Sequence, residues 1–490
     1  MFSTPVTVAP SARGTGRLWW AALALFAFTF LYRFNTLGGA LGGFDDDHFM
    51  QLAYANQVRA GERPLIDYQG VGLQGAWPPL AFVVSAAAQN LLGANLRSEA
   101  LLTVFTLAAS AALTFVAASR LAPARWAFLA TVLSVLIAPK LYAFTKVLVL
   151  AAAVLAFVAY ARRPSNATAC GLGILTAAAF LFRHDFAVYV GTGIAVLFAF
   201  TRRLEGARPL RHLALYALVT AALLTPSLLY VQRHQGLVEY LRFSREHSAR
   251  EAARTELVTP VVSLQADAEQ NAEASLYWLL TLMPFAAAVV ALRRGVEPWW
   301  RAAVLAVAAT AVVAGYFMLR GNLGARFGDV GPTAAVLGAV LCSAAAASTG
   351  SSWRRAVRLA VLAVVLAVAT ADVVLLGSVS HEIGTGGWLH GPAGLARRAA
   401  YVSSEVARLP EAAWHDEQAE DAMLVAQYIN ACTHPRDRVF LLSYAPELLP
   451  LSGRLFAGGV ANLVITSNTA EGDAFILSRL QGQSVPLVFA

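Results

Sequence analysis

Long apolar runs separated by short polar connections fill the chain from about residue 18 to residue 377. A transmembrane helix needs about 20 mostly apolar residues, and windows of this kind recur eleven times along the sequence. We therefore predict a polytopic α-helical membrane protein with about eleven spans. Their approximate ranges are 18–34, 99–118, 124–139, 144–161, 168–183, 186–201, 212–231, 275–292, 300–319, 332–348 and 356–377.

The composition supports the membrane assignment and excludes several other classes. Hydrophobic residues make up 58% of the chain, charged residues only 13%, and the mean hydropathy is +0.58, which is far above that of a soluble globular protein. The net charge of +8 is scattered between the apolar runs, so no nucleic-acid interface is expected. Three dispersed cysteines form neither a disulfide framework nor a zinc site, and the histidines lack metal-ligand spacing. We expect no metal and no other cofactor.

Arginines collect in every second connection between the predicted spans. Because short positively charged loops stay in the cytoplasm, we predict a cytoplasmic N-terminus and, with an odd number of spans, an outer C-terminal tail. No small-residue cleavage site follows the first span, so it is predicted to be a signal anchor. Only two of the 37 cations are lysines, and together with the alanine-rich runs this suggests a GC-rich bacterial genome. The expected location is the bacterial cytoplasmic membrane.

Two domains are predicted: a transmembrane domain over residues 1–377 and a small outer α/β domain over residues 378–490. In the second, residues 420–431 have helical periodicity, and residues 438–443 are strand-like. The chain stops in the apolar residues 486–490, so this domain is either incomplete or ends in a buried strand. Two predicted outer loops are long, at residues 35–97 and 232–274. The latter is charged and helix-compatible, and it either gates entry of acceptor or lipid or is simply solvated.

The first outer loop contains the acidic cluster Asp45, Asp46 and Asp47, followed by a helix-compatible run that Gly61 ends. Aspartate is a preferred helix N-cap, and carboxylates are stabilised at a helix N-terminus, which gives a purely structural alternative for one of the three. Three successive carboxylates cannot all cap one helix, and they repel one another beside a low-dielectric membrane. The pattern therefore favours a functional role for the cluster.

These residues resemble a family, the GT-C membrane glycosyltransferases, in the branch of the protein O-mannosyltransferases and the lipid A aminoarabinose transferases. The acidic pair Asp45-Asp46, then Phe49, Ala53 and Gly61, are similar to that branch's acidic pair, aromatic, small residue and glycine, where they belong to an amphipathic helix on the membrane. Residues 64–68 look like its Pro-Tyr-x-Asp segment. The resemblance implies transfer of a sugar, with inversion, from a polyprenyl-phosphate donor to an acceptor hydroxyl outside the cytoplasm. The catalytic carboxylate falls on Asp45 or Asp46, with Asp47 a third candidate; the acceptor is a protein, lipid A, a polysaccharide or another glycolipid.

A transfer of this kind needs a carboxylate that accepts the proton of the attacking hydroxyl, and cations that stabilise the departing phosphate. Arg183, His184 and Asp185 lie where the fifth predicted span reaches the outer face. Because charges within apolar runs are costly, they usually face a cavity or pair with one another. Arg183 is the candidate phosphate ligand, and Asp185 would orient it or bind sugar hydroxyls. The alternative is an interfacial turn in which Arg183 snorkels and pairs with Asp185.

Further candidates are less distinctive. Lys140, Arg320 and Arg326 lie in predicted outer connections, and either bind the lipid phosphate or serve as helix caps and headgroup contacts. Lys146 lies nearby and has the same alternatives. Asp67 is either a second carboxylate that positions the acceptor or a turn residue. A transporter or lipid flippase is the competing function, but it would place paired charges near the bilayer midplane, often within inverted repeats that are not found here.

Overall fold

All eleven predicted spans are helices in the computed structural model, which describes residues 15–37, 43–69, 78–202, 204, 208–254, 260–319, 323–347, 352–408, 417–463 and 470–489. Within those residues nine of them have the length and hydropathy needed to cross a membrane, and α5 and α7 are shorter. They are α1 (Thr15–Asn35), α4 (Leu96–Leu121), α5 (Ala124–Leu136), α6 (Phe144–Arg162), α7 (Asn166–Phe182), α8 (His184–Thr201), α9 (Pro209–His234), α11 (Ala268–Ala291), α12 (Pro298–Tyr316), α13 (Gly331–Ala346) and α14 (Ser352–Leu376). The predicted helical membrane fold is confirmed.

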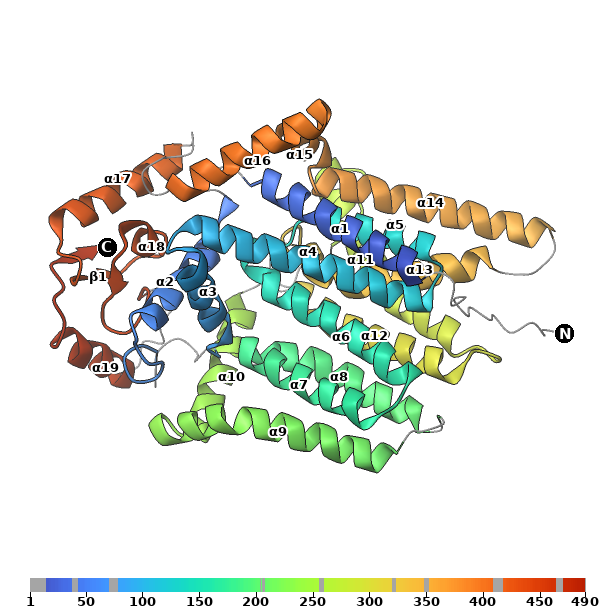
Figure 1. Ribbon diagram of the computed structural model, residues 1–490, viewed down its shortest axis with the longest axis horizontal. Coiled ribbons are helices and arrows are strands. Elements are labelled where there is room, and N and C mark those ends of the chain that lie inside the picture. The colour runs from blue at the N-terminus through green and yellow to red at the C-terminus, as the bar shows by residue number, and fades with distance from the viewer. Residues whose placement is uncertain are drawn as a thin grey trace.

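The helices form one bundle with α4, α6 and α13 inside it, while α9 and α14 run along opposite outer sides (Figure 1). About two thirds of the apolar window of α6 is buried, against 6% for α9 and 11% for α14. Small residues allow the inner helices to approach closely. At Gly193 of α8, for example, an added Cβ would collide with Thr310 of α12 and Phe157 of α6.

Two short helices stand at one end of the bundle, opposite the N-terminus (Figure 1). Helix α2 (Asp46–Arg59) follows the acidic cluster and ends before Gly61, whose φ of +82° favours glycine, as predicted. Helix α3 (Leu80–Leu92) was not predicted, because its apolar stretch of 13 residues is too short for a span. Helices α2 and α3 pack against each other, and α3 also packs against α4.

The expectation that α2 is amphipathic is wrong for this chain, because most of its side chains are buried in protein. Phe49 and Leu52 are buried in a cluster with α4 and α16, whereas Met50 and Tyr54 are buried against α3 and the C-terminal strands. Two opposite sides of α2 are therefore covered by protein. The physical reason is that the C-terminal residues fold back over α2, a contact across nearly 400 residues of sequence.

The residues after α14 form two structural parts. Helix α15 (Val379–Thr385), η6 (Trp388–His390) and α16 (Gly391–Arg408) follow α14, and α16 packs on α1 and α4. Arg398 of α16 donates to the carbonyls of Asn35 and Leu37 and so satisfies the end of α1. The second part, here named the C-terminal unit, comprises α17 (Glu417–Cys432), β1 (Arg438–Leu441), α18 (Leu448–Ser452), β2 (Leu455–Phe456), α19 (Ala470–Leu480) and β3 (Leu487–Phe489).

The C-terminal unit is a small α/β structure, as predicted. Its parallel sheet has the order β2-β1-β3, with Val439 paired to Phe456 on one side and to Leu487 on the other. The predicted helix 420–431 and strand 438–443 correspond to α17 and β1. The terminal strand β3 exists, but it is an edge strand, and the side chain of Val488 is 56% exposed. The expectation of a buried terminal strand is therefore wrong.

The remaining short elements connect the spans. They are η3 (Leu141–Ala143), α10 (Leu237–Arg254), η4 (Phe317–Leu319) and η5 (Phe327–Val330). Helix α10 confirms the helical prediction within residues 232–274, and it packs on the end of α9. Elements η3 and η5 both contact α6 and the helices around it, which places the loops before α6 and before α13 next to one another.

Candidate active site

The acidic cluster lies at the N-terminus of α2, and each of its three carboxylates has a different environment. Asp45 is the N-cap, and its Oδ1 accepts a hydrogen bond from the backbone N–H of His48 at 3.0 Å. Its Oδ2 also lies 3.2 Å from Nζ of Lys140. The same ammonium is 4.0 Å from Oδ2 of Asp47. Lys140 therefore neutralises part of the charge of this cluster, and one cation serves two carboxylates.

Asp46 has neither a hydrogen bond nor an ion pair through its carboxylate within the described part of the chain. Partial burial raises the pKa of Asp46 above the usual aspartate value, and the adjacent charges of Asp45 and Asp47 raise it further. Lys140 opposes this shift and lowers the pKa of Asp46. Asp46 is thus the carboxylate of the cluster whose lone pairs are available and whose basicity is increased.

The C-terminal unit reaches the cluster through the turn after β1. The hydroxyl of Tyr444 donates to Oδ1 of Asp47 at 3.0 Å. Burial raises the pKa of Tyr444, and the charge of Asp47 raises it further, so the phenol stays protonated and can donate. Glu447 follows in the same turn, and its pKa is raised by burial and by the charge of Asp46. Tyr444 and Glu447 belong to the C-terminal part of the sequence. In the fold they therefore lie close to an acidic cluster that comes near the beginning of the sequence.

Replacing Tyr444 by Phe is expected to lower the free energy of unfolding by about 1 kcal/mol, because a hydrogen bond to a carboxylate is lost at a half-exposed contact. Thermal and denaturant unfolding of the full chain in lipid nanodiscs measures this. Tyr428→Phe is the matched control, since that side chain is 56% exposed. Equal stability of both variants would show that Tyr444 does not anchor the C-terminal unit to α2.

Four cations form what we name the cationic cluster, namely Lys140, Lys146, Arg183 and Arg326; of these, Lys140 contacts the acidic cluster. Lys140 lies over the ring of Tyr142, with Nζ 5.7 Å from its centroid, and Nη1 of Arg326 lies 3.4 Å from the Tyr142 hydroxyl. Arg326 is also 4.0 Å from Oδ2 of Asp329. The loops before α6 and α13 therefore bring predicted residues Lys140 and Arg326 to one tyrosine.

Deeper in the bundle, Nζ of Lys146 forms an ion pair of 3.0 Å with Oδ2 of Asp329, and both side chains are at most 8% exposed. Lys146 also lies over the ring of Tyr189, 5.7 Å from its centroid. The Tyr189 hydroxyl donates to Oδ2 of Asp185 at 2.6 Å, and the guanidinium of Arg183 makes two hydrogen bonds to Asp185, of 2.8 and 2.7 Å. A chain of polar contacts thus connects the acidic cluster to the Arg183–Asp185 pair.

Some of the predicted site residues lie outside this series of polar contacts. His184 accepts from or donates to the Tyr240 hydroxyl of α10 at 2.8 Å, which attaches α10 to the corner between α7 and α8. Asp67 lies apart: its Oδ2 accepts from the backbone N–H of Arg63 at 2.8 Å, as in the turn alternative. No contact joins Asp67 to the acidic cluster among the described residues. Arg320 lies outside the described residues.

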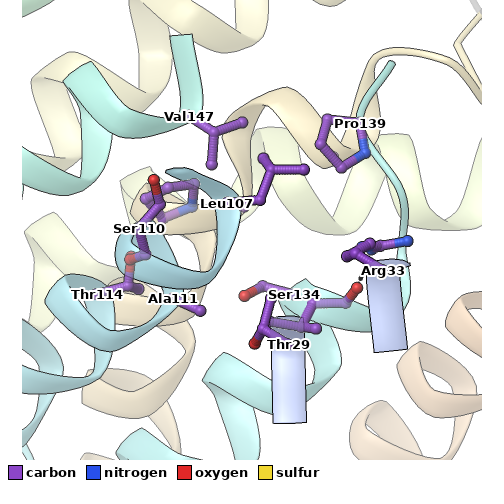
Figure 2. A pocket seen from close by; sticks show the side chains of 13 residues that line it. Thr29, Arg33, Leu107, Ser110, Ala111, Thr114, Ser134, Pro139 and Val147 are labelled. Atoms are coloured by element: carbon purple, nitrogen blue, oxygen red, sulfur yellow. Dashed lines mark hydrogen bonds between the residues drawn. The ribbon is translucent and has the colours of Figure 1, made fainter. Parts of the chain in front are cut away.

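A cavity lies beside the cationic cluster, between α1, α4, α5, α6 and α13 (Figure 2). Five of its lining residues have polar side chains, namely Thr29, Arg33, Ser110, Thr114 and Ser134. Pro139 and Gly328 also line it, and they immediately precede Lys140 and Asp329. The hydroxyl of Thr29 is buried without a hydrogen-bond partner. The rest of the lining is apolar and includes Leu107 and Val147.

Among the described residues no group of three or more His, Cys, Asp and Glu side chains has the geometry to hold a metal ion. Asp45 and Asp47 are already engaged, Asp45 by the backbone N–H of His48 and Asp47 by the Tyr444 hydroxyl. What the arrangement offers chemically is the Asp46 carboxylate near Lys140, with Arg326 next to Lys140 across the Tyr142 side chain. Such a pair of groups suits proton acceptance from a hydroxyl together with binding of a phosphate.

No protein-family model matches the sequence, and no curated protein matches it significantly. Solved structures do resemble it. The crystal structure of ArnT from Cupriavidus metallidurans in the apo state aligns with 97% of this chain and 90% of its own, at 16% identity and a TM-score of 0.54. The structure of ArnT bound to undecaprenyl phosphate aligns with 98% of this chain and 90% of its own, at 16% identity and a TM-score of 0.52. This chain has the GT-C fold.

Within the GT-C fold, sequence reasoning missed Tyr142, Asp329, Tyr444 and Glu447 as parts of the site. Asp329 carried a signal that was available: it is an acidic residue just before an apolar run, and such a charge needs a buried partner. The two tyrosines carried none, because a tyrosine near a span end is an ordinary interfacial anchor. Glu447 is an isolated acid in a soluble segment.

Proposed function

We propose that this protein transfers a sugar from a polyprenyl-phosphate-linked donor to an acceptor hydroxyl at the outer face of the bacterial cytoplasmic membrane. The observation that carries the proposal is the meeting of the acidic cluster with the cationic cluster at one end of the bundle, linked by the Lys140–Asp45 ion pair of 3.2 Å. The GT-C fold supports it, since the structural neighbour ArnT has been solved with undecaprenyl phosphate bound.

The proposed reaction is a single displacement. The acceptor oxygen attacks the anomeric carbon, the bond from that carbon to the phosphate oxygen breaks, and the hydroxyl proton passes to a carboxylate of the acidic cluster. The configuration at the anomeric carbon inverts. Asp45 and Asp46 are the candidate bases, and the free carboxylate and raised pKa of Asp46 favour it over Asp45, which already caps α2 and pairs with Lys140.

The leaving polyprenyl phosphate needs cations rather than a proton donor. Arg183 is held by Asp185 through two hydrogen bonds, which fixes the plane of its guanidinium while leaving 43% of its side chain exposed. Lys140 and Arg326 are the other accessible cations. We assign these three to the donor phosphate. We also propose that this end of the bundle lies outside the cytoplasm, an orientation that the arginine-rich alternate connections support.

The test measures release of polyprenyl phosphate from a panel of polyprenyl-phosphate monosaccharides by the full chain in lipid nanodiscs, with membrane extract as acceptor. Turnover of at least one donor, with label recovered in an acceptor, supports the proposal and identifies both sugar and acceptor. Vesicles loaded with the same donors form the second arm. Flux of an intact donor across the bilayer without any release of polyprenyl phosphate would overturn the proposal in favour of a flippase.

A further inference from the structure

Beneath the acidic cluster lies a buried polar group of three side chains from three helices. Nε2 of His48 in α2 lies 3.1 Å from Oε1 of Glu99 in α4. The hydroxyl of Ser85 in α3 lies 2.6 Å from both Glu99 oxygens. His48, Ser85 and Glu99 are each 0% exposed. A carboxylate with no solvent access is costly unless it is well hydrogen-bonded, so this arrangement is maintained against a considerable penalty.

His48 connects this buried group directly to the acidic cluster. Its backbone N–H donates to Oδ1 of Asp45 at 3.0 Å, which orients that carboxylate. Its side chain, from the same residue, is attached to Glu99 at the start of α4. The first turn of α2 is therefore linked through one residue to a transmembrane helix. A displacement of His48 would move the backbone N–H that Asp45 caps, and with it the Asp45 carboxylate.

The surroundings of His48 leave little freedom for another arrangement. Nδ1 of the imidazole is buried without a partner, so Glu99 is its described hydrogen-bonding contact through the ring. The edge of the ring meets Phe44, with centroids 4.8 Å apart. Assigning the proton to Nε2 lets His48 donate to the Glu99 carboxylate, and Ser85 donates from the other side.

We propose that His48 and Glu99 are positioning residues that fix the orientation of Asp45 and Asp46 for proton acceptance, with Ser85 holding Glu99 in place. This inference rests on the proposed glycosyl transfer for its kinetic part. The geometric part, that the start of α2 is held by the His48–Glu99 contact, is independent of the reaction. A misplacement of about 1 Å at a reacting group costs about 10²-fold in rate, which sets the size of the expected effect.

The test compares His48→Phe, His48→Gln and the wild type as full chains in nanodiscs. Phe fills the ring volume without a donor, whereas the Gln amide can donate to Glu99 from near the position of Nε2. We expect His48→Phe to lower kcat by about 10²-fold with a smaller change in KM for the donor, since Lys140 alone of the cationic cluster contacts Asp45 among the described residues. His48→Gln is expected to recover most of the lost kcat. If either variant fails to fold, Ser85→Ala probes the same group more gently.

His212→Phe is the matched control. This histidine is also buried, and its Nδ1 lies 3.0 Å from the Tyr160 hydroxyl between α9 and α6, outside the site. The kcat of the His212→Phe variant should equal that of the wild type. The same kcat in His48→Phe as in His212→Phe would overturn the proposal. So would a loss in His48→Phe that His48→Gln does not recover, because the effect would then come from general packing.

Hydrogen exchange separates this inference from the proposed function. Amides of residues 46–52 are expected to exchange faster in His48→Phe than in His48→Gln or the wild type, while those of β1 and α17 stay unchanged. Unchanged exchange at the start of α2 in His48→Phe would show that the contact does not hold it. If the wild type turns over no donor, the proposed function fails, and the exchange measurement still decides whether His48 and Glu99 position α2.

Discussion

Replacing Asp46 by Asn is expected to reduce donor turnover by about 10²–10⁴-fold, the usual contribution of a general base. Asn has nearly the shape of Asp but cannot accept the proton of the acceptor hydroxyl. Asp46 makes no hydrogen bond or ion pair within the described residues, so the change removes no structural contact. Release of polyprenyl phosphate at saturating donor measures the effect on kcat.

The pH dependence of wild-type activity is a second test of the prediction that Asp46 is the base. A base must be ionised, and burial and the neighbouring carboxylates raise the pKa of Asp46. Activity should therefore fall, as pH decreases, at a higher pH than an ordinary aspartate would give. Because the raised pKa also means that ionised Asp46 disfavours the folded state, stability contributed by this group decreases as pH rises through the raised value. Asp46→Asn should consequently unfold at the same temperature as the wild type or slightly above it.

Asp45→Asn is the comparison that separates the two candidates. Asn is as good an N-cap as Asp, so the hydrogen bond from the His48 N–H is retained while the ion pair with Lys140 is lost. With Asp46 as base, Asp45→Asn should lose less activity than Asp46→Asn. The reverse order would identify Asp45 as the base. Wild-type turnover in both variants would exclude Asp45 and Asp46 as the base.

Replacing Lys146 by Met is expected to destabilise the fold by about 3–5 kcal/mol, because it leaves a buried carboxylate without its counter-ion. The Lys146–Asp329 pair has a separation of 3.0 Å and at most 8% exposure. Oδ1 of Asp329 already lacks a hydrogen-bond partner, and Arg326, 4.0 Å from Oδ2, makes no hydrogen bond to the carboxylate that would replace the one from Lys146. Thermal unfolding of the full chain in nanodiscs, followed by circular dichroism, is the measurement.

Two further variants make this result specific. The double variant Lys146→Met with Asp329→Asn removes both charges and should recover most of the lost stability. Arg242→Gln breaks an exposed pair with Glu239 on α10 and should change stability by less than about 1 kcal/mol. A Lys146→Met variant as stable as Arg242→Gln would show that the Lys146–Asp329 ion pair does not stabilise the fold.

The sequence predicted the spans because each is a local property. An apolar window of about 20 residues becomes a helix in a membrane whatever its neighbours are, since its backbone must satisfy its own hydrogen bonds. Helix α2 was predictable for a similar reason, with Asp45 as a cap and Gly61 as a terminator. Helix α3 and the full burial of α2 were not, because they depend on α4 and on the C-terminal unit covering them.

The same division holds for the candidate site. Sequence alone identified Asp45, Asp46, Arg183 and Asp185, because clustered charges next to apolar runs are costly and need a reason. Only the tertiary structure decided which charges meet. It joined Tyr444 to Asp47 across 397 positions and Lys146 to Asp329 across 183 positions. Such pairs depend on how helices pack side by side, and a pattern read along one chain carries no information about which helix faces which.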